Sequence, residues 1–289
     1  MNWMKYRYLF FALSLVVIVP GIFSLAVWGF RPSVDFTGGA IVQLKLTPHN
    51  PDTALENIQE KYPQVSIKST DTDTTTFSLP PITQSQLEEI KAGLTPQFET
   101  VEEVSFVTVG PKAGRELLVK TITALLLTSG MVLFYIVRTF KSLKFGICAT
   151  LATLHDTLVM LGVFSLLGHF YHVEVDLLFV TAVLTTISFS VHDTIVVFDR
   201  IRELTHKNPK ATFSSLVNLA VSETLVRSLN NSLTIIFMLI ALVLLGGSTI
   251  RWFSVALLVG AVTGTYSSTF TAAPLLVLWQ QIASRRRSH

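Results

Sequence analysis

Six long apolar runs constrain the fold of this chain more than any other feature of its sequence. They occupy residues 8–30, 117–137, 145–168, 177–198, 225–245 and 252–279. Each run approaches or exceeds the ~20 residues that an α-helix needs to cross about 30 Å of hydrocarbon. Half of the 289 residues are hydrophobic and only 14% are charged, a composition unlike that of a soluble domain. The sequence therefore predicts an α-helical polytopic membrane protein with six transmembrane helices.

Basic residues collect in alternate connections between these runs. They are Lys5, Arg7, Arg138, Lys141, Lys144, Arg200, Arg202, Lys207, Lys210 and the three arginines at 285–287. The connection after the third run has no Lys or Arg, and the connection after the fifth has only Arg251. Because Lys and Arg are retained on the cytoplasmic side, we expect both termini, a loop at 199–224 and a basic tail at 285–289 to be cytoplasmic. An amphipathic stretch at 212–222 is expected to lie along the membrane surface.

The first run, within segment 1–30, follows Lys5 and Arg7 as a secretory signal would. It is too long for a signal core and lacks a small-residue cleavage site, so it is interpreted as a retained anchor. Residues 31–116 then lie on the outer side, and residues 117–284 form a bundle of five further transmembrane helices.

Segment 31–116 has the pattern of a small soluble domain. Alternating apolar and polar residues predict strands at 40–46, 65–69, 75–79 and 101–109, and helical spacing predicts helices at 51–62 and 83–94. The aspartates at 71–73 predict a turn. This β-α-β-β-α-β order is typical of an α+β ferredoxin-like domain.

Ionisable side chains inside the fourth run are the strongest functional signal. His192 and Asp193 lie there, and a charge at membrane depth costs between about 2.5 and 10 kcal/mol. Arg227, early in the fifth run, lies within about two turns of the same level. Asp193 is interpreted as a carboxyl that gains and loses a proton, with Arg227 as its counter-charge. The alternatives are a static pair that fixes helix packing, or an arginine that extends to the headgroups.

A second pair, His155 and Asp156, lies in the middle of the third run. It is either part of a proton relay or a hydrogen-bonded packing contact. No metal site is predicted, because the two pairs lie on separate helices without a metal-ligand spacing. No nucleophile pattern or nucleotide loop is present, so we expect no enzyme activity, no cofactor and no nucleic-acid partner.

Small residues mark two further places. Gly260 and Gly264 form a G-x-x-x-G face in the sixth run, suited to close helix packing. The sequence V-D-F-T-G-G at 34–39 follows the first run, and its two glycines predict a turn between membrane and domain.

The motif at 34–39, the six runs with one outer domain, and S-V-H-D-T-I-V-V-F-D-R-I-R-E at 190–203 together resemble the SecF family of the bacterial Sec protein-export machinery. The resemblance covers essentially the whole chain. It implies half of a resistance-nodulation-division fold, an outer domain in the periplasm, and a location in the bacterial inner membrane. It also implies a companion, SecD, that supplies six more spans.

The resemblance also implies roles for particular residues. The family's proton-linked aspartate and arginine correspond to Asp193 and Arg227, and its third-span H-D corresponds to His155 and Asp156. The first-span exit motif corresponds to Asp35, Phe36, Thr37, Gly38 and Gly39. His192 stands where the family commonly has Asn, so its imidazole either titrates or serves as a hydrogen-bond donor.

The function implied is that of an auxiliary translocase subunit. With SecD, it uses the proton motive force to promote export of unfolded proteins, in contact with the Sec channel complex, the preprotein and membrane lipids. Two alternatives remain from the residues: a proton-coupled exporter subunit for lipids or small molecules on the same fold, and a passive scaffold. Sodium in place of the proton also stays open.

Overall fold

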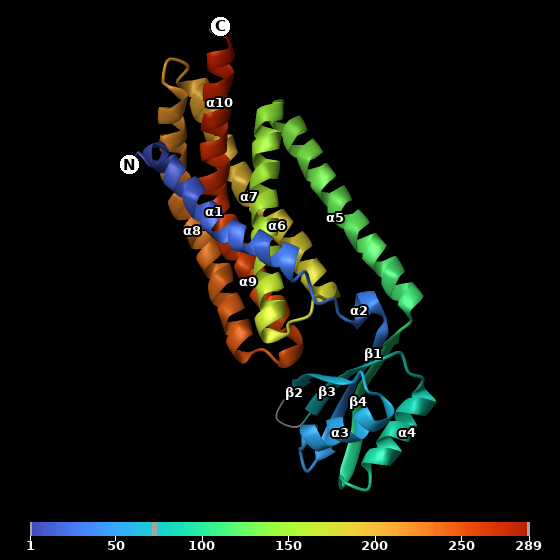
Figure 1. The fold of residues 1–289 in the computed structure, drawn as a ribbon. Helices are drawn as coiled ribbons and strands as arrows, with labels where there is room; N and C mark the ends of the chain where they lie inside the picture. Colours follow the sequence, from blue (N-terminus) through green and yellow to red (C-terminus); the bar gives the residue numbers. More distant parts are fainter. Residues whose placement is uncertain (1, 71–73, 288–289) are drawn as a thin grey trace. The chain divides into compact units, whose positions relative to one another are not determined.

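The computed structural model describes residues 2–70 and 74–287, which form two compact units. One unit comprises Met1–Arg31 with Ala124–His289, and the other comprises Pro32–Thr123. Figure 1 shows helices throughout the first unit and a sheet with helices in the second. The predicted turn at 71–73 and the last two residues of the predicted basic tail lie outside the described residues.

Six stretches of helix are long and apolar enough to cross a membrane within the described part of the chain. They are η1 (Trp3–Tyr6) with α1 (Arg7–Val27), α5 (Pro111–Phe140), α6 (Leu143–Tyr171), α7 (Leu177–Lys207), α8 (Phe213–Leu245), and α9 (Ser248–Ser267) followed by η2 (Ser268–Ala272) and α10 (Ala273–Arg287). The polytopic helical fold predicted from the apolar runs is therefore confirmed. The sixth stretch contains an irregularity that hydropathy does not reveal, because η2 is a π-helical segment between two α-helices.

Residues 199–224, predicted as a cytoplasmic loop between two spans, are largely helical, and their side of the membrane stays a prediction. They are helical except at 208–212, and the stretch 212–222, expected as a separate surface helix, contributes the first turns of α8. The physical reason is burial: Ile201 and Leu204 on α7 pack in one apolar cluster with Leu216, Val217 and Ala220 on α8. This packing extends both helices beyond the most apolar part of their sequences.

The second unit has the predicted order of strands and helices. Its elements are β1 (Gly39–Thr47), α3 (Pro51–Lys61), β2 (Ser66–Thr70), β3 (Thr74–Leu79), α4 (Gln84–Leu94) and β4 (Thr100–Val109). The sheet has the order β2-β3-β1-β4 with antiparallel neighbours, and β1 lies centrally. Val42, Leu44 and Leu46 alternate along β1 and are buried against both helices' apolar faces. The period of two residues thus places one face of the sheet in the core.

The V-D-F-T-G-G motif forms one helical turn, α2 (Val34–Thr37), directly before β1. Ser33 caps it by accepting a hydrogen bond from the Asp35 amide at 3.2 Å. Gly38 follows in a left-handed conformation with φ 78°, and a Cβ atom there would lie 2.7 Å from the Pro111 backbone. Gly38 is therefore required both by its conformation and by the close approach of the start of α5.

Candidate functional site

Asp193 lies buried in the bundle and is held by hydroxyl groups. Only 4% of the residue is exposed. Its Oδ2 atom accepts hydrogen bonds from the Ser228 hydroxyl on α8 and from the Ser268 hydroxyl in η2, the latter at 3.4 Å. Three spanning segments, α7, α8 and η2, thus meet at one carboxyl. Neutral donors satisfy an ionised carboxyl only in part, because they supply no opposite charge.

Asp156 on α6 forms a second and more completely bonded centre. Its Oδ2 atom accepts from the hydroxyls of Ser190 and Ser267, each at 2.6 Å, and its Oδ1 atom lies 2.9 Å from His155 Nδ1. Asp156 is fully buried and His155 is 8% exposed. The other ring nitrogen of His155, Nε2, is buried without a hydrogen-bond partner in the described residues. The imidazole therefore has one nitrogen on the carboxyl and one able to accept or hold a proton.

Consecutive serines connect the two carboxyl groups. Ser267 is the last residue of α9 and binds Asp156, whereas Ser268 is the first residue of the π-helical segment and binds Asp193. Segments of π-helix are rare and often occur at functional sites, because the wider turn redirects side chains. A change at either carboxyl therefore acts on the same turn of the sixth span.

Three further hydroxyls, close in sequence to these residues, have no hydrogen-bond partner among the described atoms. Thr194 follows Asp193, Ser232 lies one turn beyond Ser228 on α8, and Thr269 follows Ser268; each side-chain oxygen is buried and unbonded. Buried hydroxyls normally have a partner.

The predicted Asp193–Arg227 pair is not formed in this structure. Among the described residues, no ion pair joins the two side chains, and Arg227 is exposed on α8 beside the inward-facing Ser228. His192 is likewise exposed, next to buried Asp193 on α7. Neighbouring residues on a helix point about 100° apart, so depth in the membrane alone does not decide which of them faces the bundle.

The two glycines of the sixth span lie at a close contact between α9 and α7. A Cβ atom on Gly260 would overlap the Thr186 side chain, and one on Gly264 would lie 3.4 Å from the Phe189 ring. No group of three His, Cys, Asp or Glu side chains suited to a metal ion occurs in the described ranges.

Sequence reasoning missed the serines that hold the carboxyls. No contact with a carboxyl was predicted for the four serines, which are Ser190, Ser228, Ser267 and Ser268. Each is a buried hydroxyl in an apolar helix. That signal is visible in the sequence, but it does not indicate which carboxyl a hydroxyl reaches, because serine also bonds to its own helix.

Comparison with known proteins identifies the family. The model of the family described as "Protein export membrane protein SecD/SecF, C-terminal" matches residues 89–282. The chain is 42% identical to the protein translocase subunit SecF of Thermobaculum terrenum, over 96% of this chain and 93% of that protein. It is 36% identical to the SecF subunit of Haemophilus influenzae, over 94% of this chain and 83% of that protein.

Comparison with solved structures gives the same result. SecDF from Thermus thermophilus, described as a translocon-associated membrane protein, superposes with a TM-score of 0.86 at 30% identity and matches 97% of this chain. The super-membrane-facing form of SecDF gives a TM-score of 0.74 at 29% identity. This chain spans 39% and 40% of those two longer chains. With its near-complete overlap with SecF subunits, the chain belongs to the SecD/SecF family of protein export membrane proteins.

Proposed function

We propose that this protein is an auxiliary subunit of the Sec protein translocase that uses the proton motive force to promote export of unfolded proteins. Support for the Sec role comes from the translocase subunits to which the chain is similar over nearly their whole length. Support for the coupling role comes from one observation: Asp193 is buried in a spanning helix, and its hydrogen-bond partners among the described residues are serine hydroxyls.

The proposed assembly follows the same reasoning. SecD is the partner that would supply further spans, and the Sec channel complex, the preprotein and membrane lipids are the other contacts. Segment 31–116 is proposed as a ferredoxin-like periplasmic domain, with both termini in the cytoplasm of a bacterium. Its sheet order, β2-β3-β1-β4, is consistent with that topology.

Protonation changes what Asp193 can bind. The ionised carboxyl accepts hydrogen bonds from Ser228 and Ser268, whereas the neutral acid has a proton of its own to donate. The Ser268 hydroxyl also lies 3.2 Å from the Thr265 carbonyl, so it has a second acceptor in its own helix. Loss of the negative charge therefore releases the π-helical segment from α7, and helices α7, α8 and η2 are the elements proposed to shift.

Arg227 and His192 are proposed to act from outside the bundle core. Both are exposed beside the Asp193 site, on α8 and α7 respectively, and so face a surface that another membrane subunit can cover. Arg227 would then respond to a neighbouring charge on that subunit rather than to Asp193 in the resting state.

The energy available sets a lower limit on the number of protons. One proton crossing a potential of 100 mV supplies about 2.3 kcal/mol. Inverting a two-state equilibrium from 1:99 to 99:1 needs about 5.5 kcal/mol. More than one proton, or an added pH gradient, is therefore needed for a complete switch.

The test is export of a signal-bearing precursor in cells depleted of their own SecF and supplied with Asp193→Asn. We expect the precursor to accumulate as in depleted cells, because asparagine cannot titrate. Asp199→Asn is the matched control: it makes the same substitution on α7 at an exposed residue outside the site. Asp156→Asn, measured in parallel, separates a relay role of the second carboxyl from a packing role.

Membrane levels of each variant and of co-purifying SecD establish whether assembly survives. Normal export with Asp193→Asn would show that the carboxyl is structural and that the proposed coupling is wrong. Accumulation accompanied by normal assembly supports it.

A further inference from the structure

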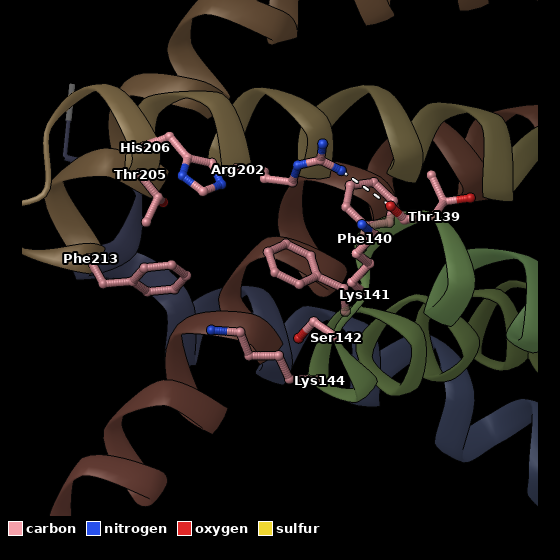
Figure 2. Close-up of a pocket in the computed structure, with 10 residues that line it drawn as sticks. Thr139, Phe140, Lys141, Ser142, Lys144, Arg202, Thr205, His206 and Phe213 are labelled. Carbon is pink, nitrogen blue, oxygen red and sulfur yellow. Dashed lines mark hydrogen bonds between the residues drawn. The ribbon is translucent and has the colours of Figure 1, made fainter.

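A basic pocket lies at one end of the helical bundle, and neither buried carboxyl is among its lining residues. Its volume is about 430 Å³. It is lined by the turn between α5 and α6, the last turns of α7 and the first residue of α8. Figure 2 shows Arg202 and His206 extending from α7 on one side, with Lys141 from the α5–α6 turn and Lys144 from the start of α6 on the other.

The lining side chains have an excess of positive charge. The pocket is lined by four basic residues, which are Lys141, Lys144, Arg202 and His206. None of its lining residues is Asp or Glu. In the part of the chain that the structure describes, none of these four forms an ion pair. By contrast, the neighbouring Arg200 and Lys207 are both paired with Glu203.

Aromatic rings and neutral hydrogen-bond acceptors hold two of these cations in place, and the Lys144 ammonium donates to the Gln280 side-chain oxygen at 3.1 Å. The Lys144 ammonium lies 5.5 Å from the Phe145 ring centre and 5.3 Å from that of Phe213. The Arg202 guanidinium lies 5.8 Å from the Phe140 ring centre and donates a hydrogen bond to the Thr139 carbonyl at 3.2 Å. Positive groups positioned by ring faces and lacking counter-charges form a site for an anion.

An exposed apolar stripe leads away from the pocket along α5. Thr139 lines the pocket, and the residues four, eight and twelve positions earlier are Tyr135, Met131 and Leu127. Residues four apart share one face of a helix. Tyr135 is 55% exposed, Met131 67% and Leu127 56%, so the stripe is open over three turns.

We propose that this pocket binds the phosphate headgroup of an anionic phospholipid, with the acyl chains lying along the α5 stripe. The pocket lies at the ends of helices long enough to span a membrane, which is where headgroups lie. Basic pockets between transmembrane helices bind such headgroups. A free phosphate ion has the same charged group as the headgroup, but it has no acyl chain to lie along the apolar stripe. The inference is independent of the proposed coupling at Asp193.

The test uses the full-length chain purified in detergent, and measures retained lipid by native mass spectrometry. The probes are phosphatidylglycerol, phosphatidylcholine and inorganic phosphate. We expect selective retention of phosphatidylglycerol, weakened roughly fivefold by Arg202→Gln and by Lys144→Gln, since one basic residue near a surface contributes about 1 kcal/mol. Arg138→Gln is the matched control, because it removes a nearby exposed charge outside the pocket lining.

A further variant removes a charge from the pocket with little risk of disturbing the fold. Lys141 has a left-handed backbone with φ 48°, which glycine adopts without strain, so Lys141→Gly removes a pocket charge at little cost to the fold. Equal retention of phosphatidylcholine, or equal loss in Arg138→Gln and the pocket variants, would overturn the proposal. Retention of inorganic phosphate without retention of phosphatidylglycerol would overturn the assignment of the ligand as a lipid.

Discussion

Asp156 and Asp193 are both buried aspartates in spanning helices, but their side chains are bonded differently. Asp156 has two serine hydroxyls at 2.6 Å and an imidazole at 2.9 Å. Asp193 has Ser228 and a more distant Ser268. A fully bonded buried carboxyl is fixed in place, whereas a partly bonded one has more to gain from a change of protonation. This difference favours Asp193 as the group that responds.

Ser228→Ala tests the contribution of the Asp193 contact to stability. Removing this donor leaves Asp193 with Ser268 alone, and we expect the free energy of unfolding to fall by about 1–3 kcal/mol. Thermal unfolding of the purified protein in detergent measures it. Thr234→Val is the control on the same helix, because its hydroxyl is exposed and donates to the Asn230 carbonyl of its own helix. An equal change in the free energy of unfolding for Ser228→Ala and Thr234→Val would contradict the assigned contact between Ser228 and Asp193.

At the scale of single elements, two helix pairs depend on glycine for their close approach. Gly21 of α1 and Gly162 of α6 face each other, and a Cβ on Gly162 would lie 2.5 Å from the Gly21 Cα atom. Ser24 and Ser165 join the same two helices at 2.7 Å. In a membrane, such backbone contacts and hydroxyl pairs supply the packing that hydrophobic burial supplies in water.

Gly162→Ala is expected to separate α1 from α6. The added methyl group meets backbone rather than a flexible side chain, so we expect the free energy of unfolding to fall by about 1–3 kcal/mol. Gly130→Ala on α5 is the matched control, because an added Cβ there meets no described atom within 4 Å. Chemical unfolding in mixed micelles, with both variants in parallel, measures the difference. An unchanged midpoint for Gly162→Ala would show that the helices tolerate a wider crossing.

The sequence predicted where the helices and strands lie along the chain better than it predicted the rotation of each helix about its own axis. Apolar runs indicated the six helices, and a period of two indicated β1, because burial imposes both patterns. In this structure Asp193 contacts Ser228 rather than Arg227, because rotation about a helix axis depends on packing against other helices; the role of Arg227 in coupling stays a prediction. The π-helical segment at Ser268–Ala272 was missed because it lies inside a long apolar run, and hydropathy does not distinguish a π-helix from an α-helix.

At the scale of the whole molecule, α5 belongs to both compact units. Its first part, through Thr123, lies in the unit with the sheet, and the remainder from Ala124 lies in the helical bundle. A second connection runs from α1 through α2 into β1. Any displacement in the bundle therefore has two covalent routes to the sheet, and one of them is an unbroken helix.

The proposed orientation of the chain can be tested by cysteine labelling. The sequence has one cysteine, Cys148, and it is buried, so background labelling is low. We expect Gln59→Cys, at an exposed position of α3, to react with a membrane-impermeant maleimide once the outer membrane is permeabilised. Lys210→Cys, between α7 and α8, is expected to react only after the inner membrane is also opened. The reverse pattern would contradict cytoplasmic termini.

The contacts of α1 also have a consequence for biosynthesis. Ser24 bonds to a residue 141 positions later, and the Phe10 carbonyl accepts from Tyr266, 256 positions later. At about 5–20 residues per second, the ribosome needs roughly 7 to 28 seconds to reach the first of these partners from Ser24. Throughout that interval, α1 resides in the bilayer without its native neighbours, while the segment that forms the sheet is completed. Helix α1 is thus made well before the residues that hold it in the bundle.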